Sequence, residues 1–289
     1  MFDAELSQCR IKHFIISKIP MKLNYKKLGE GPALIIVHGL YGSLDNWLSI
    51  AKELSQHFEV FLIDQRNHGN SPHSDSHSYT DLKNDLLEFM DDQKIEKAVL
   101  IGHSMGGKTV MFFAIDHPER VSNLVVVDIA PKNYSKISDY TPQTINHEHI
   151  VSVILNIDLS LFKSRTEINH ELANHINSEK VRQFLLKNLK RKEDKSFGWK
   201  LNIETISQYL PQIMDGIDES SFMKGKGITG FPVLFIRGEE SNYICDDDHK
   251  KIRTIFPYAE ITSIPKAGHW VHAEQPDLLI KTINYFILE

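Results

Sequence analysis

The chain has 289 residues, of which 41% are hydrophobic and 25% charged, values that predict a globular protein with a sizeable core. The formal net charge of -5 excludes a general basic surface for nucleic acid or anionic membranes. Two distant cysteines, Cys9 and Cys245, exclude a disulfide framework, and no apolar run approaches the roughly 18 residues of a membrane-spanning helix. We therefore expect a cytoplasmic protein without a membrane span.

Short apolar runs alternate with amphipathic stretches from about residue 21 onward, a rhythm typical of a mostly parallel sheet flanked by helices. The runs that predict strands buried on both faces are Ala33–Val37, Val60–Ile63, Ala98–Ile101, Leu124–Val127 and Val233–Ile236. Helical spacing between these runs predicts helices at Trp47–Leu54, Leu82–Met90 and Lys108–Ile115, the second capped by Thr80. Residues 1–20 precede the pattern and are expected to be an N-terminal extension without an assigned role.

The rhythm changes after Pro131. Residues 132–230 hold helix-compatible segments with scattered charge, and the charged cluster at 187–195 is expected to be the solvated end of a helix. The strand pattern returns at Phe231, and the remaining elements are predicted as a helix near 247–256, a strand near 261–264 and a last helix at 276–287. We therefore predict an α/β core of residues 21–131 and 231–289, interrupted by a helical cap insertion at 132–230.

The candidate nucleophile is Ser104, the central residue of a G-x-S-x-G motif. A buried strand precedes the motif and a helix of small and apolar residues follows it, which is the context of the nucleophile elbow in the α/β-hydrolase fold. Gly102 and Gly106 supply the small residues that such a tight turn requires. We expect the turn to lift the serine hydroxyl above the sheet and to aim the Met105 amide at a developing oxyanion.

A second oxyanion amide is expected at the end of the first buried strand, where His38-Gly39-Leu40-Tyr41-Gly42-Ser43 forms a glycine-bearing turn. Leu40 is the preferred donor and Tyr41 the alternative. A plain strand-to-helix turn would not explain why a histidine and two glycines gather at this strand end.

The general base is expected last in the chain, as in other serine hydrolases of this fold. His269 directly follows Gly268 in the loop after the final strand, whereas His272 lies three residues further on, where a packing role is expected. Because a serine hydroxyl needs a base within hydrogen-bond reach, His269 is predicted to activate Ser104.

The acid of the triad is less obvious. Most enzymes of this fold carry it about three residues past a glycine after the strand that follows the insertion, but Ser241 occupies that position here. The preceding strand instead ends directly in Asp128, whose carboxylate would leave the same edge of the sheet as the nucleophile. Asp128 is therefore the predicted acid, and the alternatives are Glu239, Glu240 and Asp246.

These motifs resemble the α/β-hydrolase superfamily, and within it the serine esterases of the YbfF type and their mitochondrial relatives. The resemblance covers nearly the whole chain. It rests on H-G-L-Y-G-S-L-D-N-W at 38–47, D-Q-R-N-H-G-N-S-P at 64–72, G-H-S-M-G-G-K at 102–108, V-D-I-A-P at 127–131, F-L-L-K-N-L at 184–189 and G-H-W-V-H-A-E-x-P from 268.

That resemblance implies a triad of Ser104, Asp128 and His269 with oxyanion amides at Leu40 and Met105. It also implies the hydrolysis of a small-molecule acyl ester or thioester without a cofactor, with acyl-CoA thioesters among the candidates. In the same family-based interpretation the cap sets the size of the acyl chain. Its pocket walls are expected to be Trp199, Phe184, Leu185 and Tyr243, although core packing explains these four residues equally well.

Several alternatives stay open. The same machinery serves carbon–carbon bond hydrolases and lyases, because a fold does not fix a reaction. A binding protein without activity would not need both Ser104 and His269, and dehalogenases and epoxide hydrolases of this fold use an aspartate at the elbow. No metal site is predicted, because His147 and His149 are isolated from any third ligand. Asp64 and Arg66 are expected to hold the turn after their strand together.

Overall fold

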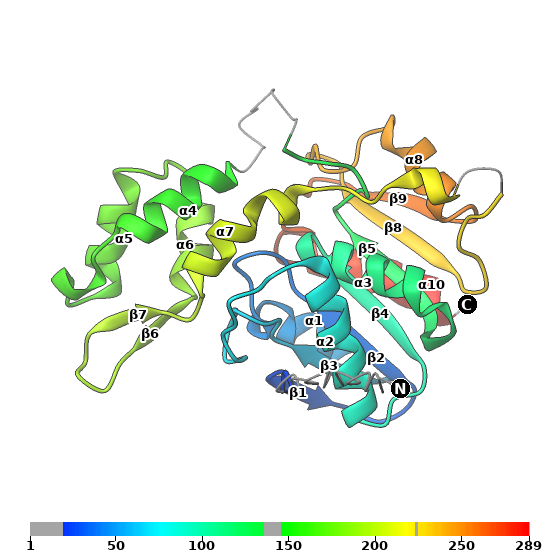
Figure 1. Ribbon diagram of the computed structural model, residues 1–289, viewed down its shortest axis with the longest axis horizontal. Coiled ribbons are helices and arrows are strands. Elements are labelled where there is room, and N and C mark those ends of the chain that lie inside the picture. Colours follow the sequence, from blue (N-terminus) through cyan, green and yellow to red (C-terminus); the bar gives the residue numbers. More distant parts are fainter. Residues whose placement is uncertain (1–19, 136–145, 223–224, 289) are drawn as a thin grey trace, which may run out of the picture.

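The computed structural model describes residues 20–135, 146–222 and 225–288. Its central feature is a seven-stranded sheet in the order β1-β3-β2-β4-β5-β8-β9 (Figure 1). The strands are β1 Tyr25–Leu28, β2 Ala33–Val37, β3 Glu59–Ile63, β4 Ala98–His103, β5 Val121–Val127, β8 Val233–Gly238 and β9 Glu260–Ile264. All neighbouring strands pair in parallel except β1, which runs antiparallel to β3. The carboxyl ends of six strands therefore meet at one edge.

Helices cover both faces of the sheet, which confirms the predicted architecture. One face packs against α2, α3 and α8, and the other face against α1 and α10. The bounds of these helices are α1 Leu48–Leu54, α2 Tyr79–Asp92, α3 Met105–Asp116, α8 Asp248–Ile255 and α10 Pro276–Leu288, with a short α9 at Val271–Glu274. Within the described ranges, every helix is too short or too polar to cross a bilayer.

The start of α2 differs from the prediction. Ser78, rather than Thr80, caps this helix: its hydroxyl accepts a hydrogen bond from the Asp81 amide, and the Asp81 side chain accepts one from the Ser78 amide. This reciprocal pair is a capping box, which satisfies amides that the first turn leaves free. Thr80 already lies inside the first turn, so it cannot cap the helix.

The segment between β5 and β8 forms a separate group of elements, which we call the cap (Figure 1). It contains α4 His147–Asn156, α5 Arg165–Ala173, α6 Glu179–Leu186, α7 Ile203–Met214 and a hairpin of β6 Leu189–Arg191 and β7 Phe197–Trp199. The hairpin corrects part of the expectation for residues 187–195: Lys187 does cap the end of α6, but β6 and the turn before β7 follow it. The predicted N-terminal extension, 1–20, lies outside the described residues except for Pro20.

The cap is joined to the core by an apolar cluster and by polar contacts. Leu40, Tyr79 and Met105 of the core share this cluster with the buried residues of α4, α6 and α7. Lys108, buried in α3, donates hydrogen bonds to the last carbonyls of α7, and the Asn202 amide donates one to the Asn67 carbonyl at 3.0 Å. The cap therefore sits over the carboxyl edge of the sheet.

Candidate active site

Ser104 forms the turn between β4 and α3 with a left-handed backbone, at φ 54° and ψ -121°. Two glycines make this turn possible. A Cβ at Gly102 would lie 2.3 Å from the Gly106 carbonyl oxygen, and a Cβ at Gly106 would lie 2.3 Å from the Val37 carbonyl oxygen. Such contacts with backbone atoms cannot be relieved by a side-chain rotation, so the turn depends on glycine at both positions.

His269 lies in the loop between β9 and α9 and faces the serine. Its Nε2 is 3.1 Å from Ser104 Oγ, and the backbone carbonyl of His269 contacts His103 Nε2 at 2.8 Å, which fixes the loop. His272, the alternative base, packs elsewhere: its ring stacks on the Trp47 indole with the centroids 4.8 Å apart. The structure thus brings His269, and not His272, to Ser104.

Asp128 directly follows β5 and extends the series of contacts that runs from Ser104 to His269. Its Oδ2 lies 2.8 Å from His269 Nδ1, and its Oδ1 accepts a hydrogen bond from the Gly238 amide at 2.9 Å. The Ser241 hydroxyl donates a further hydrogen bond to Oδ2. Asp128 is completely buried, and its backbone is also left-handed, at φ 51°.

The other carboxylates named as alternatives lie apart from this series of contacts. Asp246 pairs with Arg237 at 2.7 Å and its side chain is 82% exposed, while Glu239 and Glu240 are exposed. In the described part of the chain, Asp128 is the carboxylate in hydrogen-bond contact with His269.

Burial sets the charge state of the pair. It lowers the pKa of the His269 imidazole, so the ring is neutral near pH 7. Burial raises the pKa of the Asp128 carboxyl, against the hydrogen bonds from Ser241 and Gly238, which lower it. A neutral imidazole that donates from Nδ1 to Asp128 leaves its Nε2 lone pair facing Ser104, as a general base requires.

Two backbone amides lie free beside the nucleophile. Neither the Leu40 amide nor the Met105 amide donates to a protein acceptor within the described ranges, whereas the Tyr41 amide donates to His68 Nε2 at 3.3 Å. Tyr41, the alternative donor, is therefore already engaged. Asn188 of the cap donates from Nδ2 to the Tyr41 carbonyl at 2.7 Å and so holds this loop in place. The sequence interpretation did not assign Asn188, although it lies within the F-L-L-K-N-L motif.

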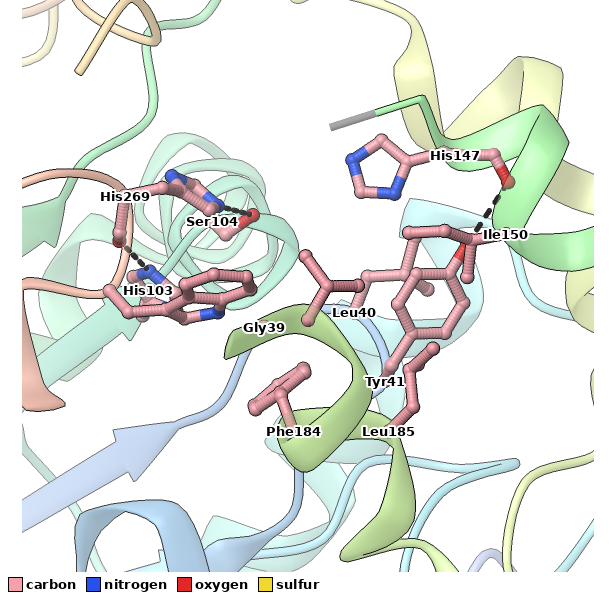
Figure 2. Close-up of a pocket in the computed structure, with 12 residues that line it drawn as sticks. Gly39, Leu40, Tyr41, His103, Ser104, His147, Ile150, Phe184, Leu185 and His269 are labelled. Carbon is pink, nitrogen blue, oxygen red and sulfur yellow. Dashed lines mark hydrogen bonds between the residues drawn. The ribbon is translucent and has the colours of Figure 1, made fainter. Parts of the chain in front are cut away.

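Two hollows meet at Ser104, and Leu40 and His147 line both of them. The first is shown in Figure 2, and we call it the open hollow because four of its residues also line a wider outer groove at the protein surface. These four are Ile150, Val181, His269 and Trp270. Its apolar walls are Ile150, Val181, Phe184, Leu185 and Trp270. The second, the inner hollow, lies under α7 and is lined by Tyr79, Met105, Lys108, Ile129, Tyr134, Ile213, Met214 and Tyr243.

Three of the four predicted pocket residues lie at these hollows. Phe184 and Leu185 line the open hollow, and Tyr243 stacks on the His269 ring with the centroids 3.7 Å apart. Trp199 does not line either hollow. It ends β7 and packs against the apolar cluster of the cap, to which Phe197, two residues earlier on the same strand, also belongs.

Asp64 and Arg66 hold the neighbouring loops. Asp64 accepts hydrogen bonds from the amides of Leu44 and Asn70, each at 2.8 Å. Arg66 makes a buried two-point contact with Asp85, with both distances 2.6 Å. Among the described residues, no three histidine, cysteine, aspartate or glutamate side chains gather into a group that could hold a metal ion.

Comparison with known proteins places this chain in a family. Residues 32–276 match the family described as alpha/beta hydrolase fold. The sn-1-specific diacylglycerol lipase ABHD11 of Danio rerio is 38% identical over 93% of this chain and 83% of its own length. Esterase YbfF of Escherichia coli is 34% identical over 88% of this chain and 92% of its own.

A solved structure titled "Marine microorganism esterase" is 46% identical, with a TM-score of 0.85 over 92% of this chain and 99% of that one. These matches and the fold confirm the family that the sequence motifs indicated. The chain belongs to the α/β-hydrolase family and is a serine hydrolase related to its esterases and lipases.

Proposed function

We propose that this protein hydrolyses small acyl esters with Ser104 as nucleophile, His269 as general base and Asp128 as the orienting acid. The observation that carries this proposal is the line of contacts from Ser104 Oγ to His269 Nε2, at 3.1 Å, and from His269 Nδ1 to Asp128 Oδ2, at 2.8 Å. Nucleophile, base and acid in this arrangement are recognised by geometry and not by chain position.

In the first half-reaction Ser104 Oγ attacks the acyl carbon while His269 Nε2 takes the hydroxyl proton. The oxygen of the tetrahedral intermediate is held by the amides of Leu40 and Met105, the latter at the N-terminus of α3. Asp128 stabilises the imidazolium that forms. The imidazolium then protonates the leaving alcohol, and the acyl group remains on Ser104.

In the second half-reaction a water molecule attacks the acyl-enzyme, and His269 takes its proton. The same two amides hold the oxyanion, and collapse of the intermediate returns the proton to Ser104 and releases the carboxylic acid. No group other than these side chains and amides is required for either half.

The names of relatives and the walls of the open hollow support an ester with an apolar acyl or alcohol part. Relatives are named as an esterase and as a diacylglycerol lipase. The walls formed by Val181, Phe184 and Leu185 offer apolar surface next to the nucleophile. Acyl thioesters, including acyl-CoA, are further candidates, because the same attack and the same oxyanion contacts serve a thiol leaving group.

The test measures hydrolysis of p-nitrophenyl esters from acetate to palmitate, with a parallel acyl-CoA series followed by thiol release. Wild type is compared with Ser104→Ala, Asp128→Asn and the matched control Asp246→Asn. We expect Asp128→Asn to lower kcat about 10⁴-fold and Ser104→Ala at least as much, because each removes a member of the triad. Asp246→Asn is expected to keep wild-type activity.

The outcomes separate the alternatives. If Asp128→Asn keeps near-wild-type activity while Ser104→Ala is inactive, the proposed acid is wrong. If wild type cleaves neither series, ester hydrolysis itself is contradicted, and carbon–carbon bond hydrolysis or lyase chemistry becomes the function to test.

A further inference from the structure

His147, the first residue of α4, brings a polar ring into an otherwise apolar part of the site. It lines both hollows that meet at Ser104 and is only 8% exposed. Figure 2 shows its ring on the cap side of the open hollow, across from Ser104 and His269. The proposed mechanism gives this histidine no role.

One nitrogen of His147 is engaged and the other is free. Nε2 lies 3.2 Å from the Tyr243 hydroxyl, and Tyr243 in turn stacks on the His269 ring. Nδ1 is buried and has no hydrogen-bond partner in the part of the chain that the structure describes. Buried polar atoms are normally paired, so an unpaired ring nitrogen on a residue that lines both hollows indicates that a ligand supplies the partner.

The other polar side chains of the inner hollow already have partners. The Tyr79 hydroxyl donates to the Ile213 carbonyl at 2.8 Å, and the Tyr134 hydroxyl donates to the Tyr243 carbonyl at 2.5 Å. Lys108 donates to the carbonyls that end α7. The free Nδ1 of His147 is therefore distinct from these groups, which hold the protein together.

We propose that His147 Nδ1 binds a second oxygen of the substrate, carried close to the scissile bond and distinct from the carbonyl oxygen that the Leu40 and Met105 amides hold. This assignment rests on the proposed ester hydrolysis and narrows it to esters with a hydroxyl or carbonyl oxygen near the reacting group. Because His147 lines both hollows, the oxygen belongs either to the acyl part or to the alcohol part.

A set of three esters distinguishes these two sources. Propyl butyrate is the parent, glyceryl 1-monobutyrate adds hydroxyls on the alcohol side, and propyl 3-hydroxybutyrate adds one on the acyl side. The value of kcat/KM is measured for each by acid release in a pH-stat. The variants are His147→Phe, which keeps a ring without the nitrogen, and His170→Phe, a matched control on the exposed surface of α5.

We expect wild type and His170→Phe to prefer one oxygen-bearing ester over propyl butyrate by about 10-fold or more, because a substrate without that oxygen leaves Nδ1 unpaired. His147→Phe is expected to abolish the preference. The ester that shows it identifies the acyl or the alcohol side. A Tyr243→Phe variant, which keeps the ring over His269 and removes the partner of Nε2, is expected to reduce the preference.

Equal cleavage of all three esters by wild type, or an unchanged preference in both His147→Phe and Tyr243→Phe, would overturn the assignment while leaving ester hydrolysis intact. A wild-type enzyme that cleaves none of the three, nor the p-nitrophenyl series, would instead contradict the proposed function and the assignment with it. Thermal unfolding of each variant shows whether a changed preference comes from a folded protein.

Discussion

The Ser241 hydroxyl donates a hydrogen bond to Oδ2 of Asp128, the same oxygen that faces His269 Nδ1. Ser241 stands three residues after Gly238, the place where the sequence pattern led us to expect an aspartate. The serine therefore supports a carboxylate that arrives from β5. The loop after β8 therefore reaches the site as the sequence pattern predicts, but it supplies a hydrogen-bond donor to the acid instead of the acid itself.

Replacing Ser241 with alanine should lower kcat, although the acid, Asp128, stays in place. A hydrogen bond to a charged group contributes about 1.5 kcal/mol or more, so we expect Ser241→Ala to lower kcat about 10-fold. The loss is limited because the Gly238 amide still binds Oδ1. Steady-state kinetics on a p-nitrophenyl ester measures it.

The double variant Asp128→Asn/Ser241→Asp tests whether position 241 can carry the acid in place of position 128. We expect it to recover at least about 10-fold of the activity that Asp128→Asn loses, because the new carboxylate would stand within reach of His269 Nδ1. A double variant no more active than Asp128→Asn would show that the β8 loop cannot present an acid to this histidine.

The acid limb of the pH profile reports the charge of His269. Only the neutral ring can accept the serine proton, so activity is present above the pKa of this ring and is lost as pH falls through it. Since burial lowers that pKa, we expect the midpoint of kcat/KM below the ordinary value of about 6.5. A profile recorded between pH 4 and 9 checks this, and a midpoint above 6.5 would contradict it.

The elbow glycines should be intolerant of even one methyl group. Gly106→Ala would place Cβ 2.3 Å from the Val37 carbonyl oxygen, so we expect a loss of about 3 kcal/mol in the free energy of unfolding. Gly198→Ala is the control, because its Cβ would meet only the flexible end of Lys192. Thermal unfolding compares the two, and equal stability would show that the turn relaxes.

Lys108 is expected to anchor the cap. Lys108→Met removes the donor that binds the Met214 and Asp215 carbonyls at the end of α7. Met214 keeps the Tyr134 amide as a partner, whereas the part-buried Asp215 carbonyl loses its own. We expect a loss of about 1–3 kcal/mol and faster proteolysis within the cap. The exposed Lys190→Met serves as the control. Urea unfolding and limited chymotrypsin digestion, which does not cleave at lysine, give the two readouts, and wild-type behaviour in both would contradict the anchoring role.

Much of this architecture could be predicted because strong local signals coincide with it. The buried strands from Ala33 to Val127 are apolar on both faces, and the elbow at Ser104 requires glycines that stand out in any sequence. The motif order also led to Asp128 and His269, which the structure brings into contact. Local sequence and global fold agree at these places.

The missed features lack such signals. β1 reads Tyr-Lys-Lys-Leu at an exposed sheet edge, where no apolar alternation is needed, and the β6–β7 hairpin has only three residues in each strand. The sequence leaves Trp199 open between a pocket wall and core packing, because large aromatic residues line pockets and cores alike. Whether a ring faces a ligand or a neighbouring helix is decided by tertiary packing, which residue type does not encode.

The position of Asp128 before the cap has a consequence for how this enzyme tolerates change. The two proposed oxyanion amides, the proposed nucleophile and the proposed acid all come from one continuous stretch, residues 40–128. Of the proposed triad, only His269 follows the cap. An insertion or deletion in the cap therefore shifts the chain position of a single participant. A cap of different length would therefore change which substrate fits, while the residues at the sheet edge keep the same chemistry.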